Sequence, residues 1–167
     1  MAVADALFRC GFPYIKTLGM RRVTSGVVDV APGPDNLVYV LVRADIPIGG
    51  CCVRILNWED EDLGTIGSTG TGDGNFQWPT KLLVDSDQNL IISDEGLNRI
   101  TIMNKDGTFI SKWGEYGCEP GQLNRPSGMA FDKDENLYVV DSFNQRIQKF
   151  TKNGDFIFSW GEYGTGE

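Results

Sequence analysis

Apolar residues along the chain recur at a spacing of two or in blocks of four, and polar turn residues separate these short runs. One stretch reads KLLVD, SDQ and NLIISD over 81–94, followed by RITIMN at 99–104 and TFISKW at 108–113. Runs rich in β-branched and aromatic residues between Asp, Asn and Gly are typical of strands joined by tight turns. No helical spacing competes, because Gly or Asp interrupts each stretch before a helix could nucleate. The pattern therefore predicts an all-β chain of antiparallel strands.

The same pattern returns 47 residues later. Residues 79–117 and 126–164 align without a gap, are identical at 17 of 39 positions and end in the shared phrase WGEYG. A more divergent copy at 24–66 contains the strand-like runs VVDV, LVYVLVR, CCVRILN and LGTIG. A sheet of four antiparallel strands repeated at about 45 residues is typical of β-propeller blades. The sequence thus predicts about three blades.

The predicted organisation alternates blades with connectors. The segment YIKTLG at 14–19 aligns with the outer strands TFISKWG and FIFSWG, so the chain is expected to open with the outer strand of another blade. The glycines of WGEYG allow the chain to cross from the rim of one blade to the inner strand of the next. The predicted segments are 1–23, leading strand(s) of an incomplete blade; 24–66, blade 1; 67–79, a connector; 80–113, blade 2; 114–126, a connector; 127–160, blade 3; and 161–167, a truncated connector.

The motifs GQL, NLYVVD and RIQKF resemble the NHL repeat, most closely over 122–150 and more weakly from about residue 24 to the end. The resemblance implies a six-bladed propeller, of which three blades and a leading strand make half a ring. Half a ring exposes the apolar sides and strand edges of its end blades. Two partners would cover them: a second copy, in a homodimer that closes the six-bladed ring, or the remaining blades of a longer protein.

Composition and charge narrow the function classes. The chain is 41% hydrophobic and 23% charged, as in a soluble globular domain, and it has neither a bilayer-spanning apolar run nor a signal-peptide pattern, so a cytoplasmic location is expected. The net charge of −8 weighs against nucleic acid as a partner. The chain has no histidine, which removes the commonest general base and zinc ligand. No cofactor is predicted.

The four cysteines lack metal-ligand spacing. Cys51 and Cys52 are adjacent, so on a strand they should point to opposite faces, and reduced thiols are expected. The turns DSDQN at 85–89 and DKDEN at 132–136 open like calcium loops, but neither has Gly at the sixth position or Glu at the twelfth. They are predicted to be strand-connecting turns, in which Asp and Asn bond their own backbone.

Two acid–base pairs repeat at the same place in both close copies: Asp94 with Arg99, and Asp141 with Arg146. Their repetition favours a blade-stabilising ion pair or backbone bond over catalysis. The tryptophans that end the outer strands are predicted to pack between blades. These are Trp113 and Trp160.

The positions that do not repeat are the better candidates for function. In a propeller, the connectors and the loops between second and third strands gather on one face, where binding residues concentrate. Aromatic, amide and Arg side chains are the types that anchor interfaces. The candidate ligand- or partner-binding residues on this face are Arg43, Asp45, Trp78, Glu95, Asn98, Tyr116, Arg125, Phe143, Asn144 and Gln145. No catalytic or metal-ligating residue is predicted.

An enzymatic alternative comes from LVYVLVR at 37–43, which resembles part of the peptidyl-hydroxyglycine lyases, NHL-like propellers with an Arg at the position of Arg43 and a zinc held by histidines. Streptogramin lyases of similar fold also use a histidine. This chain has none, so only Arg43 carries over. The leading hypothesis is an NHL-type scaffold that binds protein or peptide and self-associates. The alternative is a partial or degenerate metal-dependent lyase or hydrolase propeller, completed by a partner chain or missing blades.

Overall fold

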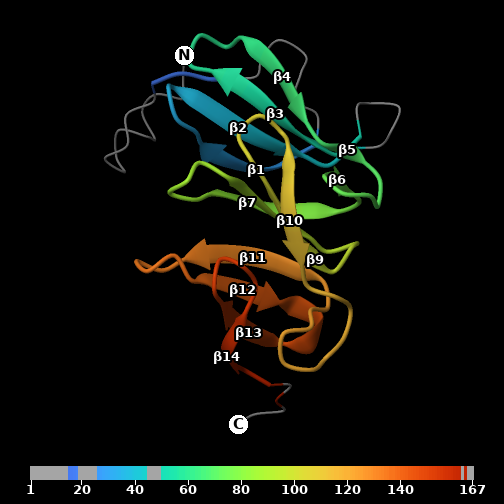
Figure 1. Cartoon of the computed structure of the whole chain (residues 1–167). Coiled ribbons are helices and arrows are strands. Elements are labelled where there is room, and N and C mark those ends of the chain that lie inside the picture. The colour runs from blue at the N-terminus through green and yellow to red at the C-terminus, as the bar shows by residue number, and fades with distance from the viewer. Residues whose placement is uncertain (1–14, 19–25, 45–49, 163, 165–167) are drawn as a thin grey trace, which may run out of the picture.

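The computed structural model describes residues 15–18, 26–44, 50–162 and 164. Three four-stranded antiparallel sheets follow one another along the chain and lie side by side (Figure 1). In each sheet every strand pairs with the next in sequence, which is the predicted meander. The prediction of an all-β chain built from four-stranded blades is therefore confirmed.

The strands begin and end close to the predicted runs, because Asp, Asn and Gly turns separate them. The first blade contains β1 (Val27–Pro32), β2 (Leu37–Val42), β3 (Cys52–Asn57) and β4 (Asp62–Ile66). The second contains β7 (Pro79–Val84), β8 (Leu90–Asp94), β9 (Arg99–Met103) and β10 (Phe109–Trp113). The third contains β11 (Pro126–Phe131), β12 (Leu137–Asp141), β13 (Arg146–Phe150) and β14 (Phe156–Trp160), with the 3-10 turn η2 (Ser142–Asn144) between β12 and β13.

The connector between the first two blades contains a small parallel pair, β5 (Ser68–Thr69) and β6 (Asn75–Phe76). Its Phe76 is fully buried, so this segment contributes to the core as well as linking the blades.

The leading outer strand expected at 14–19 is not seen at residues 15–18, which lie in no strand, and its other residues lie outside the described ranges. Residues 15–18 instead contact the first blade. Leu18 packs on its outward apolar cluster, and the Lys16 ammonium donates to the Trp58 carbonyl oxygen.

The three sheets are arranged as neighbouring propeller blades. Inner strand β7 of the second blade contacts the inner strands β1 and β11 of its two neighbours. All five residues of β8 and all five of β9 are buried, because this central blade is covered on both faces. Adjacent residues of β8 accordingly point to different neighbours: Ile92 packs in the cluster shared with the first blade, and Ile91 in the cluster shared with the third.

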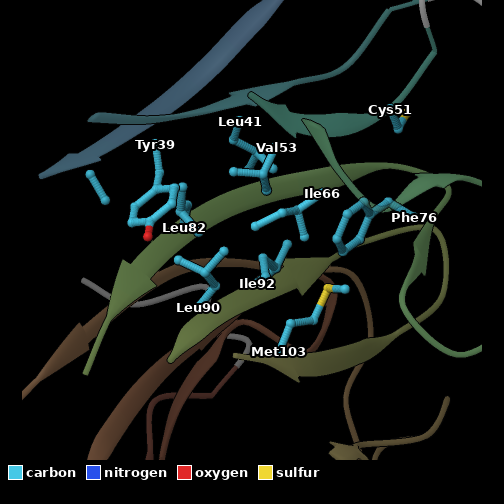
Figure 2. Packing of buried hydrophobic residues seen from close by; sticks show 11 residues of the cluster. Tyr39, Leu41, Cys51, Val53, Ile66, Phe76, Leu82, Leu90, Ile92 and Met103 are labelled. Carbon is cyan, nitrogen blue, oxygen red and sulfur yellow. The ribbon is translucent and has the colours of Figure 1, made fainter. Parts of the chain in front are cut away.

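The core consists of two interblade layers. Figure 2 shows the first, in which side chains of the first blade, Ile66 among them, meet those of the second, with Phe76 of the connector beside them. Its buried members include Tyr39, Leu41, Val53, Leu82, Leu90, Ile92 and Met103. The second layer joins the second and third blades and includes Ile91, Ile100, Ile102, Leu123, Met129, Leu137, Val139 and Phe150.

Two smaller predictions are also confirmed. Cys51 lies in the layer facing the second blade and Cys52 in the cluster on the opposite side of the first blade, and both are free thiols. The Asp-rich turns bond to their own backbone: the Asn89 N–H donates to Asp85 at 2.7 Å, and the Asn136 N–H donates to Asp132 at 2.9 Å. Both connect inner strands to second strands, as expected.

Candidate functional site

The connector before the second blade and the loop after β8 are held together by one buried carboxylate. Asp94 is fully buried and accepts hydrogen bonds from the N–H groups of Gln77 at 2.7 Å and Trp78 at 2.9 Å. It also accepts from the N–H groups of Gly96 and Leu97, both at 3.0 Å. Four backbone donors on one carboxylate fix both segments, so the loop face of this blade is ordered from within.

The third blade uses the same device with an added ion pair. Asp141, fully buried, accepts from the Asn124 N–H at 2.6 Å and from Arg146 Nε at 2.8 Å. The side-chain amides of Asn144 and Gln148 donate to it at 2.8 and 3.0 Å. The repeated acid therefore has a structural role, as its repetition predicted.

The repeated arginines hold the connectors. Arg99 donates to the carbonyl oxygens of Thr71 at 3.1 Å, Gly72 at 2.7 Å and Asn75 at 3.0 Å. Arg146 does the same for the next connector, donating to the carbonyl oxygens of Glu119 at 2.8 Å and Gln122 at 3.0 Å. Each arginine thus binds backbone of the connector that precedes its own blade.

An open cavity of about 350 Å³ lies on the loop face between the second and third blades. Five of the predicted residues line it: Trp78, Glu95, Asn98, Tyr116 and Arg125. The remaining lining residues are Gln77, Gly96 and Asn124. Sequence reasoning missed these three. Gln77 and Asn124 occupy the same position of the repeat, 47 residues apart, so the alignment of the copies carried a signal that marks them as a pair.

Arg43 extends the site toward the first blade. Its guanidinium Nη1 lies 3.2 Å from Glu95 Oε1, and its Cζ lies 5.9 Å from the centre of the Trp78 ring. An exposed contact of this kind is worth about 0.5–1 kcal/mol. Arg43 therefore links the rim of the first blade to an edge of the cavity.

Arg125 defines the opposite edge. Its guanidinium stacks 4.5 Å from the centre of the Phe143 ring, and its backbone N–H donates to Asn98 Oδ1 at 2.8 Å. Arg125 has a φ of +54°, and Asn98 a φ of +52°, so both residues adopt a left-handed conformation. That conformation is uncommon for a long side chain, and the hydrogen bond that the Arg125 N–H donates to Asn98 stabilises it. The arginine is thus held in place at its backbone while its guanidinium faces solvent.

The other predicted residues lie apart from the cavity. Phe143 does not line the cavity but lies at its rim, where its ring stacks with Arg125 and its N–H donates to the carbonyl oxygen of Asn124 at 3.1 Å. The Asn144 side chain is turned inward, donating to the carbonyl oxygen of Gly117 and to Asp141, both at 2.8 Å, so it orders the loop. Gln145 lies in a different groove, beside Val140. Asp45 lies outside the described residues. Binding by any of the predicted residues stays a prediction.

Within the described ranges, no group of three or more His, Cys, Asp or Glu side chains is placed to hold a metal ion. In the same part of the chain, no helix has the length and apolar character needed to cross a membrane.

Comparison with known proteins supports the fold. Residues 123–150 match the NHL repeat family. Over 48 residues the chain is 44% identical to Protein lin-41 of Caenorhabditis elegans, a stretch that is 29% of this chain and 4% of that protein. The third blade therefore contains an NHL repeat, as its motifs indicate.

Solved structures extend the similarity to nearly the whole chain. A streptogramin B lyase structure superposes with a TM-score of 0.66 over 92% of this chain and 46% of that one, at 15% identity. Virginiamycin B lyase from Staphylococcus aureus gives 0.60 over 87% and 44%, at 12% identity. At such identities the likeness shows the fold alone, that of β-propeller blades. The chain spans less than half the length of both structures.

Proposed function

We propose that the loop face binds a peptide segment of a partner protein, centred on the cavity beside Trp78. The observation that carries this proposal is a group of exposed aromatic rings at one cavity: Trp78, 52% exposed, and Tyr116, 70% exposed, line it, and Phe143, 60% exposed, lies at its rim against Arg125. Arg43 and Arg125 lie over two of these rings. Aromatic and Arg side chains dominate the energetics of protein interfaces, and none of these aromatic rings belongs to the buried interblade clusters.

The polar groups of the cavity suit a peptide. The amides of Gln77, Asn98 and Asn124 provide donors and acceptors for an extended backbone, and Glu95 is already paired with Arg43. An NHL β-propeller is a scaffold of the kind that binds proteins. The likeness to lyases, at 12–15% identity, supports the fold and carries no activity to this chain.

A phage-displayed random peptide library, selected on the immobilised full chain, tests the proposal. Enriched peptides should bind at least about tenfold more weakly to the Trp78→Ala variant, since an interface anchor contributes about 2 kcal/mol or more. The matched control is Trp58→Ala, because Trp58 is also an exposed tryptophan, 44% exposed, but lies on the outward side of the first blade. The loop-face site would be refuted if the enriched peptides bound Trp78→Ala as tightly as the wild type, or if Trp58→Ala weakened their binding by the same factor as Trp78→Ala.

The alternative of a metal-dependent lyase or hydrolase is tested separately. Zinc or calcium in stoichiometric amount, found by metal analysis of the purified protein, would favour this enzymatic alternative. A salt-sensitive shift of RNA in a gel would favour RNA binding instead.

Self-association that closes a six-bladed ring also stays a prediction. Light scattering tests it, because two chains would have twice the 18.4 kDa of one. Whether a second copy can close the ring depends on the shape of the exposed sides of the first and third blades, because these are the surfaces that would meet.

A further inference from the structure

The end of each outer strand packs against a turn of the next blade. Ile66 ends β4 and contacts the turn at Gly107, where an added Cβ would lie 3.1 Å from Ile66 Cγ1. Trp113 ends β10 and contacts the turn at Gly154, where an added Cβ would lie only 2.3 Å from Trp113 Cγ. The Trp113 ring also lies 4.7 Å from the Phe150 ring, centre to centre. A tryptophan at this strand end therefore requires a glycine in the turn that receives it.

The third blade presents the same kind of surface to solvent. Trp160 occupies the repeat position of Trp113 but is 44% exposed, and Val140 occupies that of Ser93, which is fully buried, but is 37% exposed. We define the open side of the third blade by four residues that correspond to buried or interblade positions of the second. They are Tyr138, Val140, Ile147 and Trp160, in place of Ile91, Ser93, Ile100 and Trp113.

This open side is hollowed. A groove of about 280 Å³ runs along it, lined by Val140, Ile147, Trp160 and Gly161 among others, and its lining is mainly apolar. The second blade buries the equivalent positions against the third, so the interface already present in the molecule indicates the kind of structure that fits the open side.

The first blade of a second copy lacks the glycine that this fit requires. Its turn between the third and fourth strands has the same hydrogen bond as the turns of the other blades and a left-handed residue at the same position. In the first blade, however, that residue is Asp60 and not glycine. In each turn the N–H of this residue donates to the carbonyl oxygen of the residue three positions earlier, at 3.1 Å for Asp60 and at 3.0 Å for both Gly107 and Gly154. The φ angles are +68° for Asp60, +85° for Gly107 and +95° for Gly154.

The side chain of Asp60 therefore begins where a tryptophan would have to pack. The same turn also receives the chain's own Lys16, whose ammonium donates to the Trp58 carbonyl oxygen, and Leu18 packs on the sheet beside it. The outward side of the first blade is thus shaped differently from the side that accepts Trp113 in the third blade.

We propose that the open side of the third blade docks a propeller blade of another sequence, one with glycine in the turn between its third and fourth strands, and that it rejects the first blade of a second copy. The glycine receives Trp160 as Gly154 receives Trp113. The docked blade covers Val140 and Ile147, as the third blade covers Ser93 and Ile100.

The test uses a cysteine at the open side as a reporter. Val140→Cys is introduced into the full chain and into a longer chain that carries a second copy of residues 121–160 after Glu167, which continues the 47-residue register and supplies a copy of Gly154. Iodoacetamide labelling is followed by peptide mass spectrometry, so that the natural cysteines do not interfere. We expect labelling of the introduced thiol to be at least about tenfold slower in the longer chain, because the added blade buries it.

The matched control replaces glycine by aspartate at the copied position 154, which reproduces the first blade's turn, and labelling should return to the rate of the unextended chain. Equal protection by both versions, or protection by neither, would overturn the proposal. A second measurement needs no added blade: labelling of the unextended variant should not change with protein concentration. A tenfold slowing on concentration would show that a second copy covers this side, and would overturn the proposal whatever the added blade does.

Discussion

The indole of Trp113 lies directly against the backbone of Gly154 across the boundary between the second and third blades. The space that a Cβ would occupy on Gly154 is 2.3 Å from Trp113 Cγ, and the φ of Gly154 is +95°. The residue at 154 is therefore constrained twice, by its backbone conformation and by its neighbour. This contact stabilises the boundary between the outer parts of the two blades, which the packing of the inner strands does not include.

Replacing Gly154 by Ala should lower the free energy of unfolding by about 2–4 kcal/mol, the sum of overpacking against Trp113 and left-handed strain. Gly121→Ala is the matched control, because its φ of +87° is similar but its nearest contact would be an ordinary 3.7 Å from Phe156. That control should lose only about 1 kcal/mol. Urea denaturation measures both, and equal losses would mean that the Trp113 contact has no energetic weight.

Asp141→Ala should destabilise the chain by about 3–5 kcal/mol, because it leaves Arg146 and the Asn124 N–H without their buried acceptor. Asp134→Ala is the control, since Asp134 is an exposed residue of a turn, and it should change stability by no more than about 0.5 kcal/mol. Denaturation of the two variants under identical conditions gives the comparison. If Asp141→Ala unfolds at the denaturant concentration of the wild type, the loop face is not held by this carboxylate.

Strand positions were predictable because they depend on local chemistry. The turns at 85–89 and 132–136 contain Asp and Asn where the backbone turns, and the blocks of apolar residues that follow them form β8 and β12. The repeat also indicated why Ile91 and Ile92 are both buried: a central blade has neighbours on both faces. Such regularities follow from period and composition, which a sequence displays directly.

The cavity was predictable only in part, because side-chain direction in a loop depends on contacts made elsewhere. Phe143 and Asn144 are adjacent, yet the Asn144 amide turns inward to the buried Asp141 while Phe143 stays on the surface under Arg125. Nothing in the local sequence distinguishes them. The placement of residues 15–18 against the first blade, with no strand, likewise results from tertiary packing of Leu18 that no repeat pattern records.

The ion pair of Asp132 and Lys149, with 2.8 Å between Oδ2 and Nζ, should make stability depend on pH in two windows. The hydrogen bond from Lys149 lowers the pKa of Asp132, so its contribution is present above the unfolded pKa of about 4 and is lost as pH falls below it. The bond to Asp132 raises the pKa of Lys149, so that contribution is present below about pH 10.4 and is lost as pH rises through the folded pKa.

Asp132→Asn should therefore be less stable than the wild type at pH 7, and the difference should shrink steadily as the pH is lowered toward 2. Denaturation midpoints measured across this range check the prediction. Asp134→Asn serves as the control, because it removes an exposed carboxylate of the same turn and leaves the ion pair of Asp132 and Lys149 in place. A gap between Asp132→Asn and wild type that stays constant into acid would show that the pair does not link protonation to folding.

The cysteines should separate into fast and slow thiols. Cys118 is exposed, whereas Cys51 and Cys52 are buried and burial raises the pKa of both, so little thiolate forms and the reagent cannot reach it. In a Cys10→Ser variant, titration with a chromogenic disulfide at pH 8 should show one thiol reacting at once and two more only after denaturant is added. Adding Cys118→Ser should abolish the fast phase and leave the slow one. Rapid reaction of Cys51 would mean that the layer between the first and second blades opens readily, which the buried Phe76 and Leu82 beside it argue against.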